Sequence, residues 1–265
     1  MSLPQLRRTL LDQRWTTIWF AVGVAAYGIL IVLFWPTMKK SQQLYEQLLA
    51  AFPEGLLKAF GIEGMGRFTG FLGTEFLNFM WPLIAAVFVV MAASSAVAGE
   101  IDRGTVELWL SVPERRWRLL LAKHAALMVE IVALSVATVL SIAIGALLVG
   151  EDIPSGGLIA PAIVLASFCV AVGGYTLLFS SLVSSRGAAA GLGAAVTLAS
   201  YLAGVLSSLS PDVERLRYLS IVSAFHPQRA LEGGEYASDA LILVAIGVVC
   251  AALSLVVFER RDANP

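Results

Sequence analysis

The sequence of 265 residues is poor in charge, in cysteine and in histidine. Only 14% of its residues are Asp, Glu, Lys or Arg, whereas a soluble domain carries about 25%. So few charges cannot cover a water-facing surface, which excludes an ordinary soluble globule. The two cysteines exclude a disulfide scaffold, and a hydrophobic fraction of 58% excludes disorder. The net charge of −1 gives no reason to expect a nucleic-acid partner.

Cysteine and histidine are also poorly placed for chemistry. Cys169 and Cys250 lie in apolar runs, so we interpret them as small hydrophobic residues. The two histidines, His124 and His226, are far apart in the predicted topology. A metal centre needs clustered ligands, and a hydrolase needs a base beside its nucleophile. The sequence therefore predicts neither, and an intramembrane hydrolase is disfavoured.

The chain does contain six long runs without Asp, Glu, Lys or Arg. A charge in hydrocarbon costs several kcal/mol, and about 20 helical residues cross a bilayer. The runs are continuously apolar, whereas barrel strands alternate. We therefore predict an all-α integral membrane protein with six transmembrane helices. The predicted spans are Trp15–Met38, Phe76–Gly99, Ile131–Gly150, Ile153–Arg186 (without the arginine itself), Gly187–Pro211 and Ala240–Phe258.

Basic residues are distributed unequally between the two sides of these spans. Eleven of the eighteen Lys and Arg lie on one side, on short segments that include both termini. The other side has seven basic residues and eleven carboxylates. Because cytoplasmic segments carry an excess of Lys and Arg, we predict that both termini are cytoplasmic.

Two long connections lie on the predicted outer side. Residues 39–75 repeat apolar residues at helical spacing, which is typical of amphipathic pieces that lie along the membrane surface. One predicted helical face leads into the second span and consists of Phe68, Phe71, Leu72, Phe76 and Phe79. Residues 211–239 fit either a re-entrant or an interfacial helix, and Gly233-Gly234 turns the chain before the last span.

The inner segment between the second and third spans, residues 100–118, is dense in charge, with four carboxylates and four arginines. We call it the elbow. Gly104 predicts a break, and Thr105 is placed to cap a short helix. The apolar face of that helix comprises Val106, Trp109 and Leu110.

A second helix is predicted to start within the elbow. Ser111 and Glu114 have the spacing of a capping box, and Pro113 falls in the first turn, where a missing N–H does no harm. This helix would run through residues 115–118 into the third span. Two helix starts and eight charges indicate a docking surface; the alternative is a solvated loop facing lipid headgroups.

The elbow resembles the signature of the type-2 ATP-binding-cassette permeases. The matching letters are EIDRGTVELWLSVP at residues 100–113, then RR at 115–116 and LLLAK at 119–123. FPEG at 52–55 and FERRD at 258–262 extend the resemblance over nearly the whole chain. The Gly-Thr-x-Glu block is the most specific part, and Trp109 departs from the small or aliphatic residues common in relatives. In this family the region is the coupling helix, which sits in a cleft of the ATPase subunit.

The resemblance implies one permease domain over residues 1–265 that pairs with a second permease subunit. A homodimer is favoured over a heterodimer. The resemblance also implies two ATPase subunits that bind ATP and Mg²⁺, and export of an unidentified substrate by alternating access through a prokaryotic cell membrane. The ATPase-coupling residues that it implies are Glu100, Asp102, Arg103, Gly104, Thr105, Val106, Glu107, Trp109, Leu110, Ser111, Pro113, Arg115 and Arg116. Those expected to make polar contacts with the ATPase are Glu100, Arg103, Glu107, Arg115 and Arg116.

The chain itself indicates that any ATPase is a separate protein. A phosphate-binding P-loop needs a Gly-Lys pair, and none of the four lysines follows a glycine. We therefore expect no cofactor and no enzymatic activity on this chain. The alternative is an ATP-independent secondary transporter or channel. It is disfavoured because the two halves show no internal repeat and Glu130 is the only candidate for coupling an ion inside the membrane.

Glu130 is the one carboxylate well inside a predicted helix, and the third span can begin near His124 if the protein accommodates this carboxylate. Thr138 and Ser141 fall within about 80° of Glu130 around the helix, so these residues form a polar stripe. Such a stripe is expected to face protein or water rather than lipid. Glu130, Thr138 and Ser141 are therefore candidates for the translocation path. The alternative is a carboxyl group hydrogen-bonded to a neighbouring helix.

Small residues recur in the fifth span. Gly187, Gly191, Ser200 and Gly204 follow mostly at four-residue spacing, with Gly193 beside them. Such residues let helices approach closely, either within the subunit or at a subunit interface, and both options stay open.

Overall fold

The computed structural model of the chain describes residues 3–41, 66–105, 115–153, 157–209 and 211–260. Within these ranges the regular elements are helices and no strand occurs. Six segments are long and apolar enough to cross a membrane, which confirms the predicted all-α architecture. They are Leu3–Lys40, Phe68–Ser94, Arg116–Val149, Ile159–Leu182, Arg186–Ser207 and Ala237–Arg260.

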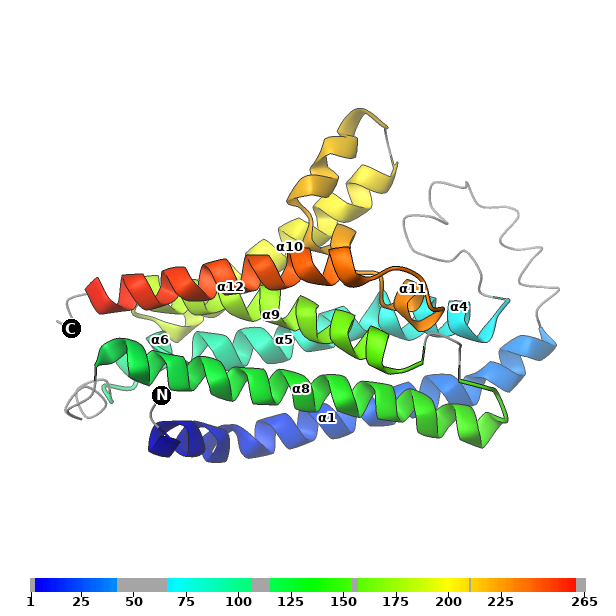
Figure 1. Cartoon of the computed structure of the whole chain (residues 1–265), viewed down its shortest axis with the longest axis horizontal. Helices are drawn as coiled ribbons and strands as arrows, with labels where there is room; N and C mark the ends of the chain where they lie inside the picture. Colours follow the sequence, from blue (N-terminus) through cyan, green and yellow to red (C-terminus); the bar gives the residue numbers. More distant parts are fainter. Residues whose placement is uncertain (1–2, 42–65, 106–114, 154–156, 210, 261–265) are drawn as a thin grey trace.

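The long helices form a bundle of two packed pairs with one helix between them (Figure 1). Helix α1 (Leu3–Lys40) packs along α8 (Arg116–Val149), and α9 (Ile159–Leu182) packs along α12 (Ala237–Arg260). Helix α5 (Met80–Ser94) contacts members of both pairs. Both termini lie at the same end of the bundle, as does the short helix α6 (Ala98–Asp102). Which membrane side this end faces stays a prediction.

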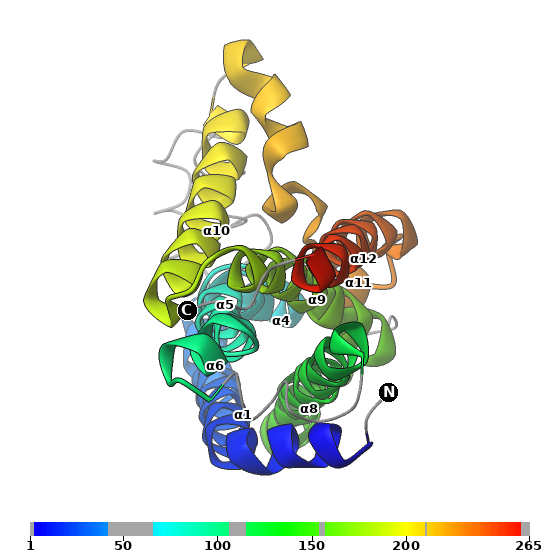
Figure 2. The same cartoon turned by 90° about the vertical axis from the view of Figure 1, so that its left-hand side faces the viewer.

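Helix α10 (Arg186–Leu209) leaves the bundle at an angle, and η2 (Pro211–Leu219) folds back beside it (Figures 1 and 2). Large apolar side chains on α10 are exposed, for example Leu198 at 60% and Leu202 at 50%. In water such a surface would be unfavourable, so it indicates contact with lipid or with another membrane helix.

The helices extend beyond the charge-free runs. Helix α1 begins at Leu3, well before the predicted Trp15, and includes Arg8 and Asp12, which lie 3.8 Å apart one helical turn from each other. Helix α8 likewise begins at Arg116 instead of near Ile131. The reason is that lack of charge marks what lipid tolerates, whereas a helix can continue into polar surroundings.

The described part of the first outer connection, residues 66–75, packs into the bundle. Most of the amphipathic pieces predicted to lie along the membrane surface fall in residues 42–65, outside the described residues. Helix α4 (Phe68–Leu72) packs on α1, with the rings of Phe68 and Phe71 centred 5.7 and 5.6 Å from that of Trp35. The π-helix η1 (Gly73–Leu77) then leads toward α5. A π-turn is wider than an α-turn and rotates the residues that follow it. Phe79 is consequently 49% exposed instead of sharing the buried face.

The second outer connection reaches into the bundle. After η3 (Ile221–Ala224), Phe225 is 4% exposed and its ring lies 4.7 Å from Phe168 and 5.9 Å from Trp81. Helix α11 (Pro227–Leu231) follows, and Gly233 turns the chain with a φ of +82°, as predicted. Residues 221–231 are therefore packed against the bundle, and the choice between a re-entrant and an interfacial position in the membrane stays a prediction.

Candidate functional site

Just before the elbow, a buried serine on α9 holds together a sharp break between α5 and α6. Ser180 donates its hydroxyl proton to the carbonyl oxygen of Ser94, at 3.0 Å. Its oxygen also accepts hydrogen bonds from the backbone N–H groups of Val97 and Ala98, at 3.1 and 3.0 Å. One hydroxyl therefore satisfies backbone groups on both sides of the break, which would otherwise be buried without partners.

Helix α6 ends in a Schellman motif at the predicted glycine. Gly104 has a φ of +68°, and its N–H donates to the Ile101 carbonyl at 2.9 Å. The N–H of Thr105 donates to the Glu100 carbonyl, also at 2.9 Å. This pair of bonds closes a helix C-terminus, so the break predicted at Gly104 is confirmed. The Thr105 hydroxyl donates back to the Glu100 carboxylate at 2.6 Å; the helix that Thr105 was predicted to cap lies outside the described residues.

The carboxylate of Glu100 is the centre of a partly buried charge cluster. Lys123 of α8 lies 2.8 Å from it, and Arg103 lies 3.4 Å from the same oxygen. The side chains of Glu100 and Lys123 are only 14% and 8% exposed. Burial acts to raise the pKa of Glu100, but Lys123, Thr105 and Arg103 outweigh it and hold this pKa below its usual range. Glu100 therefore stays ionised and points into the protein.

The third span does not begin as the capping-box pattern predicted. Arg115 is extended, with φ −65° and ψ +136°, and α8 begins at Arg116. A ψ of that sign breaks the helical hydrogen-bond ladder, so no helix runs through Arg115 into α8. Arg115 is instead the N-cap residue of α8, and its carbonyl accepts the N–H of Arg118 at 2.9 Å.

The two described ends of the elbow present charges to solvent. Asp102 and Arg103 are exposed at the end of α6, Arg115 is exposed before α8, and Arg116 is half-buried. Figure 2 views this end of the bundle, with α6 in front of α5. The other predicted coupling residues lie outside the described residues: Val106, Glu107, Trp109, Leu110, Ser111 and Pro113.

The three predicted path residues of α8 all face protein within this chain. Glu130 is 2% exposed and lies against α1, where the Gln13 amide, turned with its nitrogen toward Glu130, donates to both carboxylate oxygens at 3.2 and 3.1 Å. Thr138 accepts the indole N–H of Trp81 at 2.7 Å, and Ser141 donates to the Thr138 carbonyl at 2.6 Å. These contacts match the alternative of a carboxyl bonded to a neighbouring helix; a role in translocation stays a prediction.

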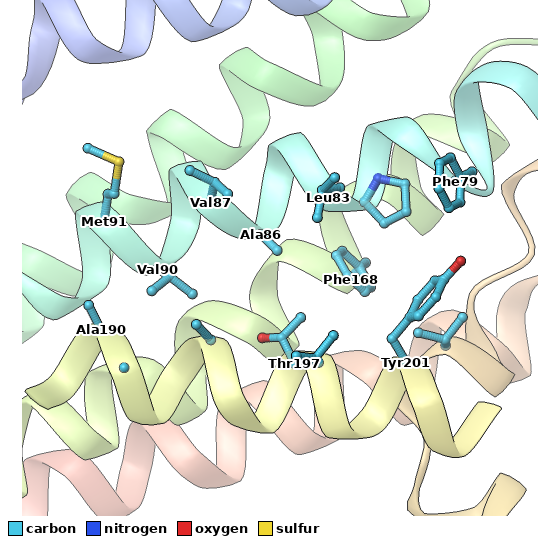
Figure 3. Close-up of a pocket in the computed structure, with 15 residues that line it drawn as sticks. Phe79, Leu83, Ala86, Val87, Val90, Met91, Phe168, Ala190, Thr197 and Tyr201 are labelled. Atoms are coloured by element: carbon cyan, nitrogen blue, oxygen red, sulfur yellow. The ribbon is translucent and has the colours of Figure 1, made fainter. Parts of the chain in front are cut away.

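An apolar groove of about 650 Å³ lies between α5 and α10 (Figure 3), and Glu130 is not among the residues that line it. None of the described residues that line it is charged. Its lining includes Leu83, Val87, Met91, Phe168, Ala194 and Tyr201. Thr197 also lines it and links α10 to α9, because its oxygen accepts the Tyr175 hydroxyl at 2.5 Å while its own proton goes to the Gly193 carbonyl.

The small residues of α10 have two different surroundings. A Cβ on Gly193 would lie 2.6 Å from the Thr176 hydroxyl oxygen, and Ser200 accepts the Ile221 N–H at 2.7 Å. These positions serve packing within the chain. At Gly191, by contrast, nothing lies within 4 Å of the position a Cβ would occupy.

No sequence pattern indicated three contacts near the elbow and along α8: Ser180 at the break, Gln13 with Glu130, and His124 with Ser254. The His124 Nε2 lies 3.1 Å from the Ser254 hydroxyl, which links α8 to α12. The partners are 82 to 130 residues apart in the chain, so no local pattern could have revealed them. Among the described residues, no group of three His, Cys, Asp or Glu is placed to hold a metal ion.

The spans and the anchored elbow define a multi-pass membrane protein with a charged surface segment between its second and third helices. Residues 20–263 match the model of a family described as ABC-2 family transporter protein. A comparison with curated proteins gives no match. Because the family match covers most of the sequence, the chain belongs to the ABC-2 family of membrane transporter components.

Family membership fixes the broad role of the chain. Proteins of this family are the transmembrane subunits of ATP-binding-cassette transporters, are not themselves catalytic, and normally pair with an ATPase subunit. The chain is therefore a multi-pass permease, and the resemblance found at the elbow is confirmed at the level of the family.

Proposed function

We propose that this chain is the permease subunit of an ATP-driven exporter in the cytoplasmic membrane, powered by two separate ATPase subunits that bind ATP and Mg²⁺. The observation that carries the proposal is the elbow. Its described ends expose Asp102, Arg103 and Arg115 beside both termini, at one end of the bundle. A segment that only joined two spans would not need charges of both signs at this density.

The mechanism is alternating access. ATP binding closes the ATPase pair, and the elbow in contact with it is displaced. Because the elbow lies between α5 and α8 in the chain, its displacement moves two spans together. Packed helices shift as nearly rigid bodies, so a small movement at one end of the bundle can open the other.

Co-purification with a candidate ATPase encoded beside this chain tests the docking surface. We expect Arg115→Glu to weaken ATPase binding about tenfold or more, since it reverses a charge at the interface. The matched control is Arg215→Glu, the same substitution at an exposed arginine of η2. If no candidate ATPase associates with the unmodified chain, the proposal fails. Equal loss of ATPase binding in both variants would show that the elbow is not the binding surface.

We also propose that a second copy of the chain packs against the outward face of α10. This face carries exposed leucines, and the uncharged groove between α5 and α10 opens beside it, where it would contribute to the substrate path. With Cys169 and Cys250 replaced by alanine, we expect Leu198→Cys to give a disulfide-linked dimer in membranes. Leu147→Cys, on the 77% exposed Leu147 of α8, is the control. Crosslinking from Leu147→Cys alone would move the interface to α8.

A further inference from the structure

The side chain of Glu100 is occupied within its own chain. One carboxylate oxygen lies 2.8 Å from the Lys123 ammonium and 3.4 Å from Arg103, and the other accepts the Thr105 hydroxyl at 2.6 Å. Only 14% of the side chain is exposed. A residue that contacts another protein needs open lone pairs and an accessible surface, and Glu100 offers little of either. Its neighbour Asp102 is exposed.

The Glu100–Lys123 pair joins α6, which leads into the elbow, to α8, which follows the elbow. Glu100 belongs to α6, and Lys123 lies seven residues after the start of α8, about 10 Å along the helix axis at 1.5 Å per residue. The pair thus bridges the start of the elbow to the flank of the third span. A partly buried ion pair costs desolvation, so it is weak evidence for added stability. Its best-attested benefit is to fix the relative placement of two elements.

The start of the elbow is anchored to the other helices as well. The hydroxyl of Ser180, a residue of α9, forms hydrogen bonds with backbone groups on both sides of the break between α5 and α6. Arg186, the first residue of α10, donates to the Met91 carbonyl at 3.3 Å just before the break. The ion pair adds the contact with α8. The start of the elbow therefore cannot move without moving the spans to which it is tied.

We infer that Glu100 is a positioning residue whose ion pair with Lys123 carries displacement of the elbow to α8, and that it is not a contact for the ATPase. The inference rests on the proposed function and corrects the expectation that the Glu100 carboxylate faces the partner. Docking falls instead to exposed charges such as Asp102, Arg103 and Arg115.

The test separates binding from transmission in the whole complex of permease and ATPase. An environment-sensitive fluorophore on Glu235→Cys, at the far end of the bundle, reports the response to ATP after Cys169 and Cys250 are replaced by alanine. The variant is Glu100→Gln/Lys123→Met, which removes both charges together and so avoids leaving one of them buried without the other. We expect ATPase affinity within about twofold of the unmodified complex, and an ATP response that falls about tenfold.

Two controls keep the outcome specific. Lys123→Arg preserves the ion pair and is expected to retain the response. Lys39→Met/Glu151→Gln removes an ion pair of 2.7 Å at the opposite end of the bundle and is expected to leave the response unchanged. The inference is overturned if the Glu100→Gln/Lys123→Met variant loses ATPase binding as Arg115→Glu does, or if it keeps the full response. If the unmodified chain binds no ATPase, it is the proposed function that fails.

Discussion

At the scale of single residues, one hydrogen bond links α5 to α8 in the centre of the bundle. The indole N–H of Trp81 donates to the Thr138 hydroxyl at 2.7 Å, and both side chains are fully buried. Valine has the shape of threonine but leaves this N–H without its acceptor. Interhelical hydrogen bonds in membranes are worth about 0.6 kcal/mol on average and at most about 1.7. We expect Thr138→Val to lower the unfolding free energy in micelles by about 1 kcal/mol, and Thr37→Val, on the exposed side of α1, to have no effect.

A second residue-scale prediction concerns acid. Glu151 accepts hydrogen bonds from the Lys39 ammonium at 2.7 Å and the Trp35 indole at 2.8 Å, and these contacts hold its pKa below the usual range. With a lowered pKa in the folded state, the stabilisation is complete above the unfolded-state value of about 4.3 and is lost as pH falls through the folded-state value. Because Lys39 is largely exposed, the effect stays below about 1 kcal/mol.

The measurement is the difference in unfolding free energy between the unmodified chain and Glu151→Gln, followed from about pH 7 to about pH 3. We expect this difference to shrink toward acid, because protonation removes the same charge that the substitution removes. A difference that stays constant over that range would show that Glu151 contributes through shape and not through its charge.

The residues of the elbow illustrate what a sequence can predict about a site. The glycine break at Gly104 was predictable because a left-handed backbone favours glycine locally. The inward direction of Glu100 was not, because its partner Lys123 is 23 residues away and only packing brings the two together. The start of α8 was not predictable either. The sequence has a capping-box pattern, but Arg115 has an extended backbone, so the helix predicted from that pattern does not continue into α8.

At the scale of elements, α9 and α12 approach each other through two glycines. A Cβ on Gly174 would overlap the carbonyl oxygen of Gly247, and one on Gly247 would overlap that of Val170. A backbone cannot swing aside as a side chain can, so the helices would have to separate. We expect Gly247→Ala to cost about 1–3 kcal/mol of unfolding free energy.

The control for this crossing is Gly23→Ala in α1, where nothing lies within 4 Å of the new methyl group. Alanine favours a helix over glycine, so this variant should be neutral or slightly stabilising. Both variants are compared by unfolding in the same detergent. If Gly247→Ala were as harmless as Gly23→Ala, the two helices would have to lie farther apart than the structure places them.

The number of helices was predictable because a charge in lipid outweighs every local preference. The course of the outer connections was not, because apolar periodicity cannot distinguish a helix on the membrane surface from one inside the protein. Phe71 packs on Trp35 and Phe225 on Phe168, contacts that join distant parts of the chain. The π-helix η1 (Gly73–Leu77) also has no recognisable pattern in the sequence, yet it determines the direction in which Phe79 points.

At the scale of the whole molecule, the arrangement of the helices gathers the charges as the positive-inside pattern requires. The basic residues of the elbow, the start of α10 and both termini lie at one end of the bundle (Figure 1). The end of α8, which is followed by Glu151, and the start of α12, which contains Asp239, lie at the opposite end. Loops carrying an excess of Lys and Arg stay on the cytoplasmic side during insertion, so this end should face the cytoplasm.

Labelling of single cysteines with a membrane-impermeant maleimide tests this orientation in a chain whose Cys169 and Cys250 are replaced by alanine. We expect Tyr218→Cys, on an 83% exposed residue of η2, to react in intact cells. Arg8→Cys and Glu259→Cys should react only after the membrane is opened, because both lie at the end that carries α6. Reaction of Arg8→Cys in intact cells would place the elbow outside, beyond the reach of a cytoplasmic ATPase. That result would contradict both the predicted orientation and the proposed function.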